Sequence, residues 1–577
     1  MTYTAPTAEQ RFVLDTVADI TGLSALPGFD GATPDMVEAI LEEVGRLAGE
    51  VFAPLNRIGD TVGARLEGDT VTLPPGFAEA YARYVEGGWA SLGASPAHGG
   101  QGLPFVLASA VQEQLTSANM AFSLCMMLSQ GAIEALQAHA SPELQETYLT
   151  KLVSGEWTGT MNLTEPQAGS DVGALRTRAD PHADGSYRVK GQKIYITWGE
   201  HNVAPNIVHL VLARLPDAPP GTRGISLFLC PKILPDGSRN DLRCVGLEHK
   251  LGIHASPTCT MAFGEHDGCV GYLVGAEGGG MKAMFTMMNH ARVNVGLQGV
   301  AIAERAYQGA LSFAKDRVQG GGKRIIEYPD VRRMLLTLKA STEAIRALAY
   351  YNAAAVDRAH AAHDPEAKAL ADLLTPITKA YATDLGVELS SLAVQVFGGM
   401  GYVEETGAAQ HLRDARIAPI YEGTNGIQAM DLVGRKLSAG AWKPLFADIR
   451  DLVRALPRAG DLGIIGPYLD DALGALENAT VWMTGNSGDA ADDNAAGATP
   501  YLRMFGVTLG GYLLARQAVA ASERLSDGEG DPVFLKAKIA TARFFAEQIL
   551  PSATALLGPA TRGAAGLFAV PEEALSA

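Results

Sequence analysis

Apolar residues recur at steps of three and four along most of the chain, which is the spacing of one face of an α-helix. The pattern is clearest in TPDMVEAILEEVGRLAGEVFAPLN, residues 33–56, where Thr33 can cap the helix and Pro34 suits its first turn. The apolar stripe of this segment consists of Met36, Ile40, Val44, Leu47 and Val51. We predict helices over residues 9–152, with a break in the glycine-rich loop at residues 87–104.

Between residues 159 and 275 the pattern changes to short runs rich in β-branched and aromatic residues, separated by turns. These runs are YRVKGQKIYITWG, NIVHLVLARL, GISLFLC and TCTMAFGE. From Gly280 the helical spacing returns, and its longest stripe stops at Gly398, where a glycine can end a helix. That stripe consists of Ile377, Tyr381, Leu385, Leu389, Leu392 and Val396. A further helical block follows Leu437, and within it TGNSGDAADDNAAGATP predicts an exposed, mobile loop.

The order of these patterns predicts a mainly α protein with an inserted β domain. A chain of 577 residues is too long for one hydrophobic core, so several domains are expected. We predict an N-terminal helical domain, a middle β domain, a C-terminal helical domain and an additional helical domain. Their predicted boundaries are residues 1–158, 159–278, 279–437 and 438–577.

The composition narrows the class of protein. The formal net charge of -17 argues against a nucleic-acid binder, although a local basic pocket could still hold an anionic small molecule. The five cysteines form no CxxC pair and no Cys/His spacing typical of a metal site, so we expect reduced thiols in a cytoplasmic protein and no metal. The N-terminal residues lack the apolar core of a signal peptide, and no apolar run is long enough to predict a membrane span.

Four stretches could carry chemistry. In ARIAPIYEGTNGIQAMD, Glu422 is either an ordinary solvated loop residue or a base kept away from water. MNLTEPQAGSDVGALRTRA, residues 161–179, is either a plain turn or a loop that offers backbone N–H groups to a phosphate or a ring carbonyl. Tyr195 and Thr197 share one face of a predicted strand, which suits a flat heteroaromatic ligand or simple packing. Arg292 lies on an apolar helix and needs a partner if that helix is buried, whether it binds substrate or forms a structural salt bridge.

Some nucleotide-binding and hydrolase signatures are absent from the sequence. DRVQGGGKRIIEYPDVRRM has three glycines before Lys323 and Arg324 and could approach a phosphate, but it lacks the P-loop pattern. No GxGxxG motif follows a predicted strand, and no Gly-x-Ser-x-Gly elbow is present. Neither a P-loop nucleoside triphosphatase nor a Rossmann enzyme is indicated.

Taken together, LTEPQAGSD, GQKIYIT, QVFGGMGY and RDARIAPIYEGTN, in this order, resemble the acyl-CoA dehydrogenase family of flavoproteins. The resemblance implies an N-terminal helical domain, a middle β-barrel and a C-terminal four-helix bundle, with FAD as cofactor. It also implies an acyl-CoA substrate and electron-transfer flavoprotein as the acceptor. EHKLGIHASPTCTM and the additional helical block resemble a long bacterial branch, which includes enzymes for 3-methylthiopropanoyl-CoA from dimethylsulfoniopropionate and enzymes for fatty acyl-CoA.

The resemblance assigns Glu422 as the base that removes the α-proton of the acyl thioester while a β-hydride passes to flavin N5. Hydrogen bonds to the thioester carbonyl that strengthen as enolate charge develops would make that proton removable. A dry pocket would raise the pKa of the carboxylate towards the range that a general base needs. Gly423 leaves room for the thioester. The substrate-binding residues implied by the resemblance are Ser170, Asn289, Arg292 and Gly423.

The resemblance also implies a set of FAD contacts, some of which belong to the FAD of a neighbouring subunit and imply a homodimer. The whole set is Met161, Leu163, Thr164, Gly169, Ser170, Tyr195, Ile196, Thr197, Arg317, Gln395, Gly398, Gly399, Thr424 and Gly426. The residues that would reach the neighbour are Arg317, Gln395, Gly398 and Gly399. The chain departs from the family pattern with Tyr195 for tryptophan, Asn289 for aspartate, RVQGGG for RxxFG and Gly426 for glutamine.

Three functions are compatible with these residues. The first is an acyl-CoA dehydrogenase that forms a trans-2-enoyl-CoA, with 3-methylthiopropanoyl-CoA or a short- or medium-chain fatty acyl-CoA as substrate. The second is an acyl-CoA oxidase, which would pass electrons to dioxygen. The third is a non-catalytic flavoprotein scaffold, against which the intact YEGT motif around Glu422 argues.

Overall fold

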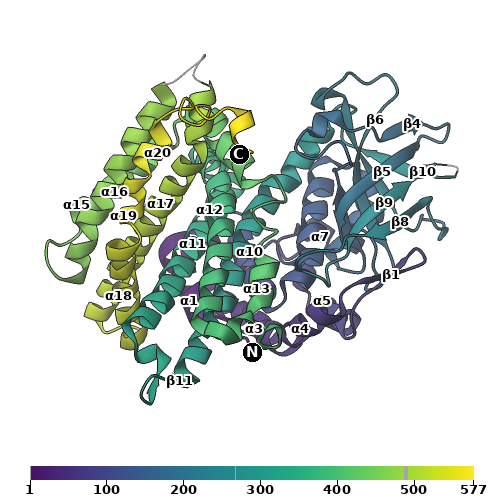
Figure 1. Ribbon diagram of the computed structural model, residues 1–577. Helices are drawn as coiled ribbons and strands as arrows, with labels where there is room; N and C mark the ends of the chain where they lie inside the picture. Colours follow the sequence, from purple (N-terminus) through teal and green to yellow (C-terminus); the bar gives the residue numbers. More distant parts are fainter. Residues whose placement is uncertain (1, 267, 486–490, 577) are drawn as a thin grey trace.

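The computed structural model describes residues 2–266, 268–485 and 491–576. Figure 1 shows helices filling one side of the molecule and a β domain forming the other, with the last helices of the chain at the edge farthest from the β domain. The fold is therefore mainly α with one inserted β domain, as the sequence predicts. We propose that its four domains span residues 1–158, 159–278, 279–437 and 438–577.

The first part of the chain is helical. Its helices are α1 (Thr7–Val13), α2 (Ile20–Ser24), α3 (Pro34–Leu47), α4 (Ala53–Val62), α5 (Phe77–Glu86), α6 (Phe105–Ala118), α7 (Met120–His139), α8 (Pro142–Leu144) and α9 (Thr150–Val153). Thr33 caps α3 as predicted, because its hydroxyl accepts a hydrogen bond from the Met36 amide at 3.3 Å. The predicted stripe is wrong at Met36, which is 48% exposed, because the buried face also includes Val37 and Leu41.

One hairpin interrupts these helices and was not predicted. It consists of β1 (Arg65–Glu67) and β2 (Thr70–Thr72). Val71 at its centre is buried in the hydrophobic core of the β domain. The hairpin is too short for a clear alternating pattern in the sequence, and its burial depends on the β domain against which it packs.

The β domain is a closed barrel. Its strands are β3 (Thr158–Asn162), β4 (Arg178–Pro181), β5 (Tyr187–Thr197), β6 (Ile207–Arg214), β7 (Ile225–Pro231), β8 (Leu242–Leu247), β9 (Thr258–Phe263) and β10 (Cys269–Val274). The sheet closes because β10 pairs with both β7 and β5. The long strand β5 also pairs with β4 and β9, so its last residues extend beyond the ring. All five cysteines are buried free thiols.

Three long helices follow the barrel and pack side by side. They are α10 (Gly280–Asp316), α11 (Pro329–Ala361) and α12 (Pro365–Phe397), followed by the short helices α13 (Ala408–Ala415) and α14 (Asn425–Asp431). The hairpin β11 (Val318–Gln319) and β12 (Lys323–Arg324) joins α10 to α11. The predicted stripe of α12 is buried except at Leu392, which is partly buried, and Gly398 ends the helix with a φ of 59°.

The last helices are α15 (Trp442–Ala455), α16 (Gly460–Gly485), α17 (Ala491–Asp527), α18 (Pro532–Gln548), α19 (Pro551–Ala555) and α20 (Leu557–Thr561). Helix α17 packs on α11, α12 and α14, and Gly506 permits the close approach because a Cβ there would lie 2.4 Å from the Tyr381 ring. The predicted mobile loop at residues 484–500 is wrong for residues 491–500, which form the first turns of α17, because tertiary packing outweighs their polar composition. Residues 486–490 lie outside the described part of the chain.

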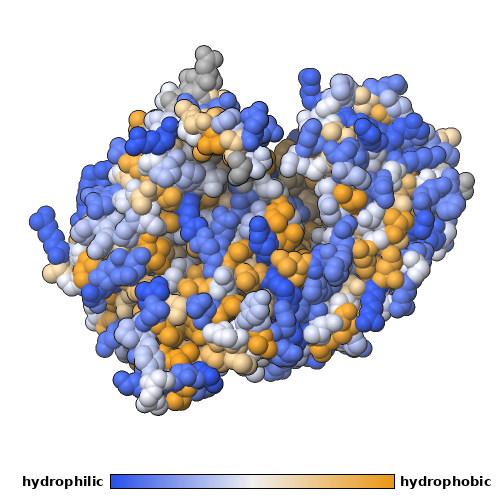
Figure 2. Space-filling view, viewed as in Figure 1, coloured by the Kyte–Doolittle hydropathy of each residue, from blue (hydrophilic) through white to orange (hydrophobic). Residues whose placement is uncertain are grey.

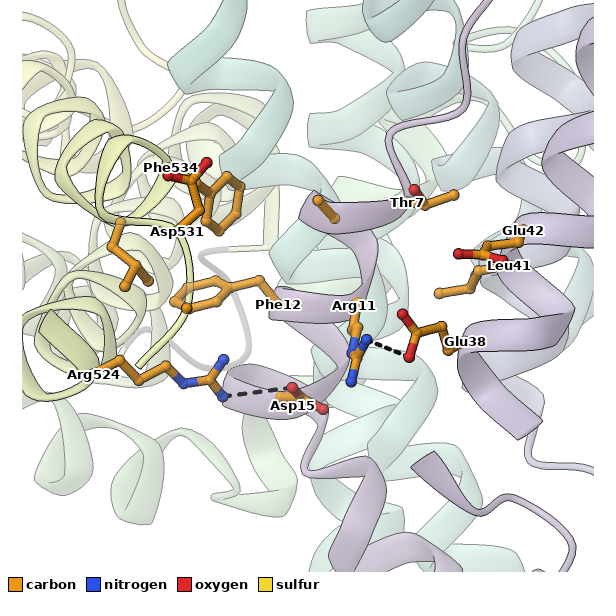
Figure 3. A pocket seen from close by; sticks show the side chains of 13 residues that line it. Thr7, Arg11, Phe12, Asp15, Glu38, Leu41, Glu42, Arg524, Asp531 and Phe534 are labelled. Atoms are coloured by element: carbon orange, nitrogen blue, oxygen red, sulfur yellow. Dashed lines mark hydrogen bonds and ion pairs between the residues drawn. The ribbon is translucent and has the colours of Figure 1, made fainter. Parts of the chain in front are cut away.

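The last helices also pack against the start of the chain. The buried Lys538 ammonium donates to Glu9 and to Glu343, each at 2.7 Å. Beside this contact, α1, α3 and α18 enclose a cleft of about 410 Å³ whose charged side chains form pairs such as Arg11 with Glu38 at 2.6 Å (Figure 3). None of the predicted site residues lines this cleft. Among the described helices, none is both long and apolar enough to cross a membrane.

Candidate active site

Glu422 lies in the loop between α13 and α14, and its backbone is strained. Its φ is 54° and that of Gly423 is 83°, so two successive residues adopt positive φ angles. Such angles cost energy for a residue with a side chain and persist only where the surroundings hold them. The surroundings are the start of α14, where the Thr424 hydroxyl accepts from the Ile427 amide at 3.3 Å, and Pro419, whose carbonyl accepts from the Asn425 amide at 3.0 Å.

The carboxylate of Glu422 is partly withdrawn from solvent. Burial raises its pKa above that of a free glutamate, while the charges of Lys379 and Arg292 act in the opposite direction. The side chain is partly buried rather than exposed. A raised pKa is what a general base near neutral pH requires, so the environment favours a base over an ordinary solvated loop residue.

Arg292 is a buried cation on α10, as the sequence predicts, and it is 6% exposed. Its guanidinium lies 3.5 Å from the carboxylate of Asp431, which also accepts a hydrogen bond from Arg435 at 2.7 Å. Burial lowers the pKa of Arg292, while Asp431 and Glu422 raise it. Arg292 pairs with Asp431 and also lies close to Glu422. A structural salt bridge and a role in substrate binding are therefore compatible.

Gly423 has little room for a side chain. A Cβ atom at this position would lie 2.7 Å from the Gln428 amide nitrogen and 3.7 Å from the Arg292 guanidinium. The same Gln428 nitrogen donates to the Gly423 carbonyl at 3.2 Å. The structure therefore supplies two reasons for glycine here, a positive φ and a close side-chain neighbour, besides the predicted space for a thioester.

Lys379 and Asn425 belong to the same region and were missed by the sequence analysis. Lys379 lies on α12, is 0% exposed, and donates from its ammonium group to the Asn425 side-chain oxygen at 2.9 Å. Lys379 falls between Ile377 and Tyr381, off the apolar stripe of α12, and a lone lysine within this largely apolar segment is the available signal.

On the barrel side, Tyr195 and Thr197 end strand β5. A β-bulge between Lys193 and Ile196 gives Tyr195 a φ of 60° and leaves it 59% exposed. Beyond the bulge the burial alternates as predicted, because Ile196 and Trp198 are buried while Tyr195 and Thr197 lie on the more open side. The Thr197 carbonyl accepts from the Thr160 hydroxyl at 2.7 Å, which fixes the end of the strand.

The loop that follows β3 is hydrogen-bonded to strand β5 through its carbonyls, whereas its tip is exposed to solvent. The Leu163 carbonyl accepts from the Lys193 ammonium at 3.0 Å, and the Thr164 carbonyl accepts from the Ile194 amide at 2.9 Å. Met161 is buried in β3, whereas Gly169 and Ser170 are exposed. A loop with anchored carbonyls and exposed tips fits the predicted role of offering polar groups to a ligand.

Two more predicted residues lie close to Glu422. Thr424 caps α14, and Gly426 is exposed in the first turn of that helix. Asn289 lies on α10, three residues before Arg292, and its side chain lies outside what the structure describes.

The remaining predicted residues lie at the opposite end of the long helices. Arg317 follows α10 by one residue and is 25 positions from Arg292, which corresponds to about 38 Å along a helix. Gln395, Gly398 and Gly399 lie at the end of α12, and the ends of the two helices meet where the Phe313 and Phe397 rings stack at 4.6 Å. The structure brings these four exposed residues to one end of the molecule, but not to the Glu422 of the same chain.

Helices close to the Glu422 region pack on the β domain. Helix α7 packs on β3 and β5, and α10 packs on β7. Figure 2 shows a hollow between the helical part and the β domain, with hydrophobic surface in its depth. Within the described ranges, no three His, Cys, Asp or Glu side chains group as a metal site.

The chain matches four family models that together cover most of its length. Their descriptions are acyl-CoA dehydrogenase N-terminal domain (residues 35–156), middle domain (160–265) and C-terminal domain (278–437), and acetyl-CoA dehydrogenase C-terminal like (445–571). The order and limits of these matches follow the helical, barrel and helical parts of the fold.

Relatives match over nearly the whole chain. The 3-methylmercaptopropionyl-CoA dehydrogenase of Ruegeria pomeroyi is 46% identical, over 96% of this chain and 97% of that protein. A butyryl-CoA dehydrogenase of Syntrophomonas wolfei is 36% identical, over 94% and 93%. The solved structure of Caenorhabditis elegans ACDH-11 in complex with C11-CoA superposes with a TM-score of 0.80 at 22% identity, covering 95% of this chain and 92% of that one, which shows the same fold. The chain therefore belongs to the acyl-CoA dehydrogenase family, whose members are FAD-dependent oxidoreductases.

Proposed function

We propose that the protein oxidises 3-methylthiopropanoyl-CoA to its trans-2-enoyl-CoA, with Glu422 as the base that removes the α-proton. The observation that carries the proposal is the Glu422 carboxylate, held by a strained backbone in a partly buried environment that raises its pKa. The charges of Lys379 and Arg292 act against this rise. We infer that the same neighbours exclude water from the side chain.

The residues at the boundary between the barrel and the helices fit an FAD molecule. Tyr195 presents an exposed aromatic ring on a strained backbone, and the tip of the loop after β3 is open at Gly169, where an added Cβ would meet no atom within 4 Å. Bound FAD supplies the acceptor for the β-hydride. Residues that would hold its ring are Met161, Leu163, Thr164, Tyr195, Ile196 and Thr197. Residues that would face its pyrophosphate or the CoA arm are Gly169, Ser170, Thr424 and Gly426.

The preference for a short acyl group is supported by the partly buried Tyr421 next to the base and by two buried side chains, Gln298 and Met127. The Tyr421 hydroxyl donates to the Gln298 side-chain oxygen, and the Gln298 nitrogen donates to the Met127 sulfur at 3.5 Å. Gln298 thus fills volume next to Tyr421, the residue before Glu422, and we infer that it limits the depth available to an acyl tail entering beside the base. The Met127 sulfur is polarisable and suits a thioether tail. The Ruegeria pomeroyi relative supports the same substrate.

Butyryl-CoA is the second candidate substrate. The Syntrophomonas wolfei relative is a butyryl-CoA dehydrogenase, and a four-carbon chain has nearly the length of the 3-methylthiopropanoyl group. A hydrophobic pocket separates such similar tails weakly. The shared chemistry is a short, unbranched acyl thioester.

We further propose a homodimer in the cytoplasm that passes electrons to electron-transfer flavoprotein. The dimer is supported by Arg317, Gln395, Gly398 and Gly399, which lie too far from Glu422 to serve its own flavin and are exposed for contact with a second chain. The acceptor follows from the family resemblance, and the solved structure reported for the electron transferring flavoprotein of Acidaminococcus fermentans contains a chain of this fold, at 27% identity and a TM-score of 0.58, over 69% of this chain and 96% of that one.

The test mixes the purified yellow protein anaerobically with acyl-CoAs of increasing chain length and follows flavin bleaching. We expect the fastest bleaching with 3-methylthiopropanoyl-CoA and butyryl-CoA, and little with long chains. Glu422→Gln should abolish bleaching at unchanged flavin content, whereas the exposed Glu79→Gln should behave as wild type. Full activity of Glu422→Gln contradicts the proposal, and fast reoxidation by dioxygen during turnover would assign an oxidase instead.

A further inference from the structure

Lys379 is a buried cation with few partners. It lies at the middle of α12, is 0% exposed, and follows the helix proline Pro376 by three residues. An ammonium group can donate three hydrogen bonds, yet in the described part of the chain it donates one, to the neutral side-chain oxygen of Asn425 at 2.9 Å. A charge held this deeply is costly unless neighbouring groups compensate it.

Asn425 connects this lysine to the loop that carries Glu422. Its side-chain nitrogen, which carries two hydrogens, lies within hydrogen-bonding distance of three acceptors of α12, namely the Ala380 carbonyl at 3.1 Å, the Thr383 hydroxyl at 3.0 Å and the Asp384 carboxylate at 2.7 Å. Its backbone amide donates to the Pro419 carbonyl at 3.0 Å. The loop is therefore fastened to α12 through one side chain, and Lys379 holds the acceptor end of that side chain.

The charges around Lys379 come from three elements. Glu422 comes from the loop, Asp384 from α12 itself and Arg292 from α10. Burial lowers the pKa of Lys379 to about 7, Glu422 and Asp384 act against this, and Arg292 lowers the pKa further. Among the charged neighbours that lower the pKa of Glu422, Lys379 has a larger effect than Arg292.

We propose that Lys379 is a positioning residue for the base: it fastens the loop of residues 419–425 to α12 through Asn425 and places a positive charge beside the Glu422 carboxylate. The inference rests on the proposed role of Glu422 and deepens it, since Lys379 sets the proton affinity of the base without touching the substrate. Removing the charge leaves the partly buried Glu422 with less compensation, so its pKa rises further.

The test compares the pH dependence of kcat/KM in flavin-loaded variants. Lys379→Gln removes the charge and keeps a polar group that can face Asn425; the acidic limb of its profile should move upward by about one pH unit. Lys379→Arg keeps the charge, so the acidic limb of its kcat/KM profile should lie at the same pH as that of the wild type. Lys368→Gln is the matched control, because Lys368 lies on the same helix and is exposed. Flavin content and thermal unfolding establish that each variant is folded.

Asn425→Ala separates the two roles of Lys379. This variant removes the fastening and leaves the charge, so kcat should fall roughly tenfold or more while the acidic limb does not move upward. An unshifted limb in Lys379→Gln overturns the electrostatic role, and an unchanged kcat in Asn425→Ala overturns the fastening. Both results leave the proposed function intact if wild-type protein still bleaches with short acyl-CoAs; a wild-type protein inert to all of them overturns the proposed function itself.

Discussion

The Lys193 ammonium donates to the Glu165 carboxylate at 2.8 Å, and with side chains 0% and 4% exposed neither residue reaches bulk water. This pair joins strand β5 to the loop after β3, the two segments proposed to hold the flavin ring. Burial tends to raise the pKa of Glu165, but Lys193 and the amides of Thr177 and Arg176 bring it down to about 2. Burial lowers the pKa of Lys193 to about 8 against the attraction of Glu165. The pair is thus charged at neutral pH.

Lys193→Met should destabilise the protein strongly, because it leaves the Glu165 carboxylate buried without its cation. The expected loss in free energy of unfolding is about 3–5 kcal/mol, together with weaker retention of flavin. Denaturant unfolding and the flavin-to-protein ratio measure the two effects. Lys190→Met, on the exposed side of the same strand, is the control and should change neither. An unaltered unfolding midpoint for Lys193→Met would show that the pair contributes little.

The value of kcat/KM should fall on the acidic side of its pH profile. The apparent pKa of this limb should lie above the ordinary glutamate value of 4.5, because burial raises the pKa of Glu422. Glu422 accepts a proton only as a carboxylate, so kcat/KM is retained above its pKa and lost as the pH falls through it. A pH series of kcat/KM with a short acyl-CoA measures the limb. A limb at or below 4.5 would mean that Glu422 is well solvated in the working enzyme.

Gly423→Ala should reduce activity more than stability. A side chain at a φ of 83° is strained, and its Cβ would meet the Gln428 amide at 2.7 Å, so the loop must shift and carry Glu422 with it. A displacement of this kind lowers kcat by roughly 100-fold. Gly434→Ala is the control, because no atom lies within 4 Å of its added Cβ. Equal kcat values for the two variants would exclude a need for glycine at position 423.

Mixed dimers should recover activity that neither parent has. Glu422→Gln removes the base of its own chain, and Arg317→Ala removes a contact proposed to serve the flavin of the partner. A hybrid of the two chains keeps one site with both residues intact, because Glu422 lies near Arg292, about 38 Å along α10 from Arg317, and the two residues of one chain are proposed to serve different sites. Co-expression with two affinity tags isolates the hybrid. Activity no greater than the mean of the parents would place Arg317 outside the shared site.

Gln298→Ala should widen the range of acyl chains. The substitution removes the side chain that links Tyr421 to Met127 and opens space beside the base. The ratio of kcat/KM for octanoyl-CoA to that for butyryl-CoA should rise by about tenfold or more. Gln308→Ala, ten residues further along α10, should leave the ratio unchanged. A constant ratio in Gln298→Ala would locate the acyl tail elsewhere.

Local patterns predicted much of the fold. Helix α6 begins at Phe105, as expected from the return of helical spacing after the glycine-rich loop, and the four predicted strand runs correspond to β5, β6, β7 and β9. Helix α18 begins at Pro532 with Asp531 as its cap, and an Asp-Pro pair is a local signal for the start of a helix. These features depend on residues close in sequence. The β1–β2 hairpin and the first turns of α17 were not predicted, because their stability depends on packing against residues that are distant in the sequence.

The sequence by itself determined the long helices, four strands of the barrel, where Glu422 stands in its motif, and that Arg292 needs a partner if its helix is buried. Only the tertiary structure decided which charged and polar side chains contact one another in the interior. Lys193 meets Glu165 across 28 positions, and Lys379 meets Asn425 across 46. Periodicity along the chain records which face of an element is buried, but it holds no information on which residue of another element lies opposite. That choice follows from the packing of barrel against helices, and it fixes how strongly Glu422 holds its proton.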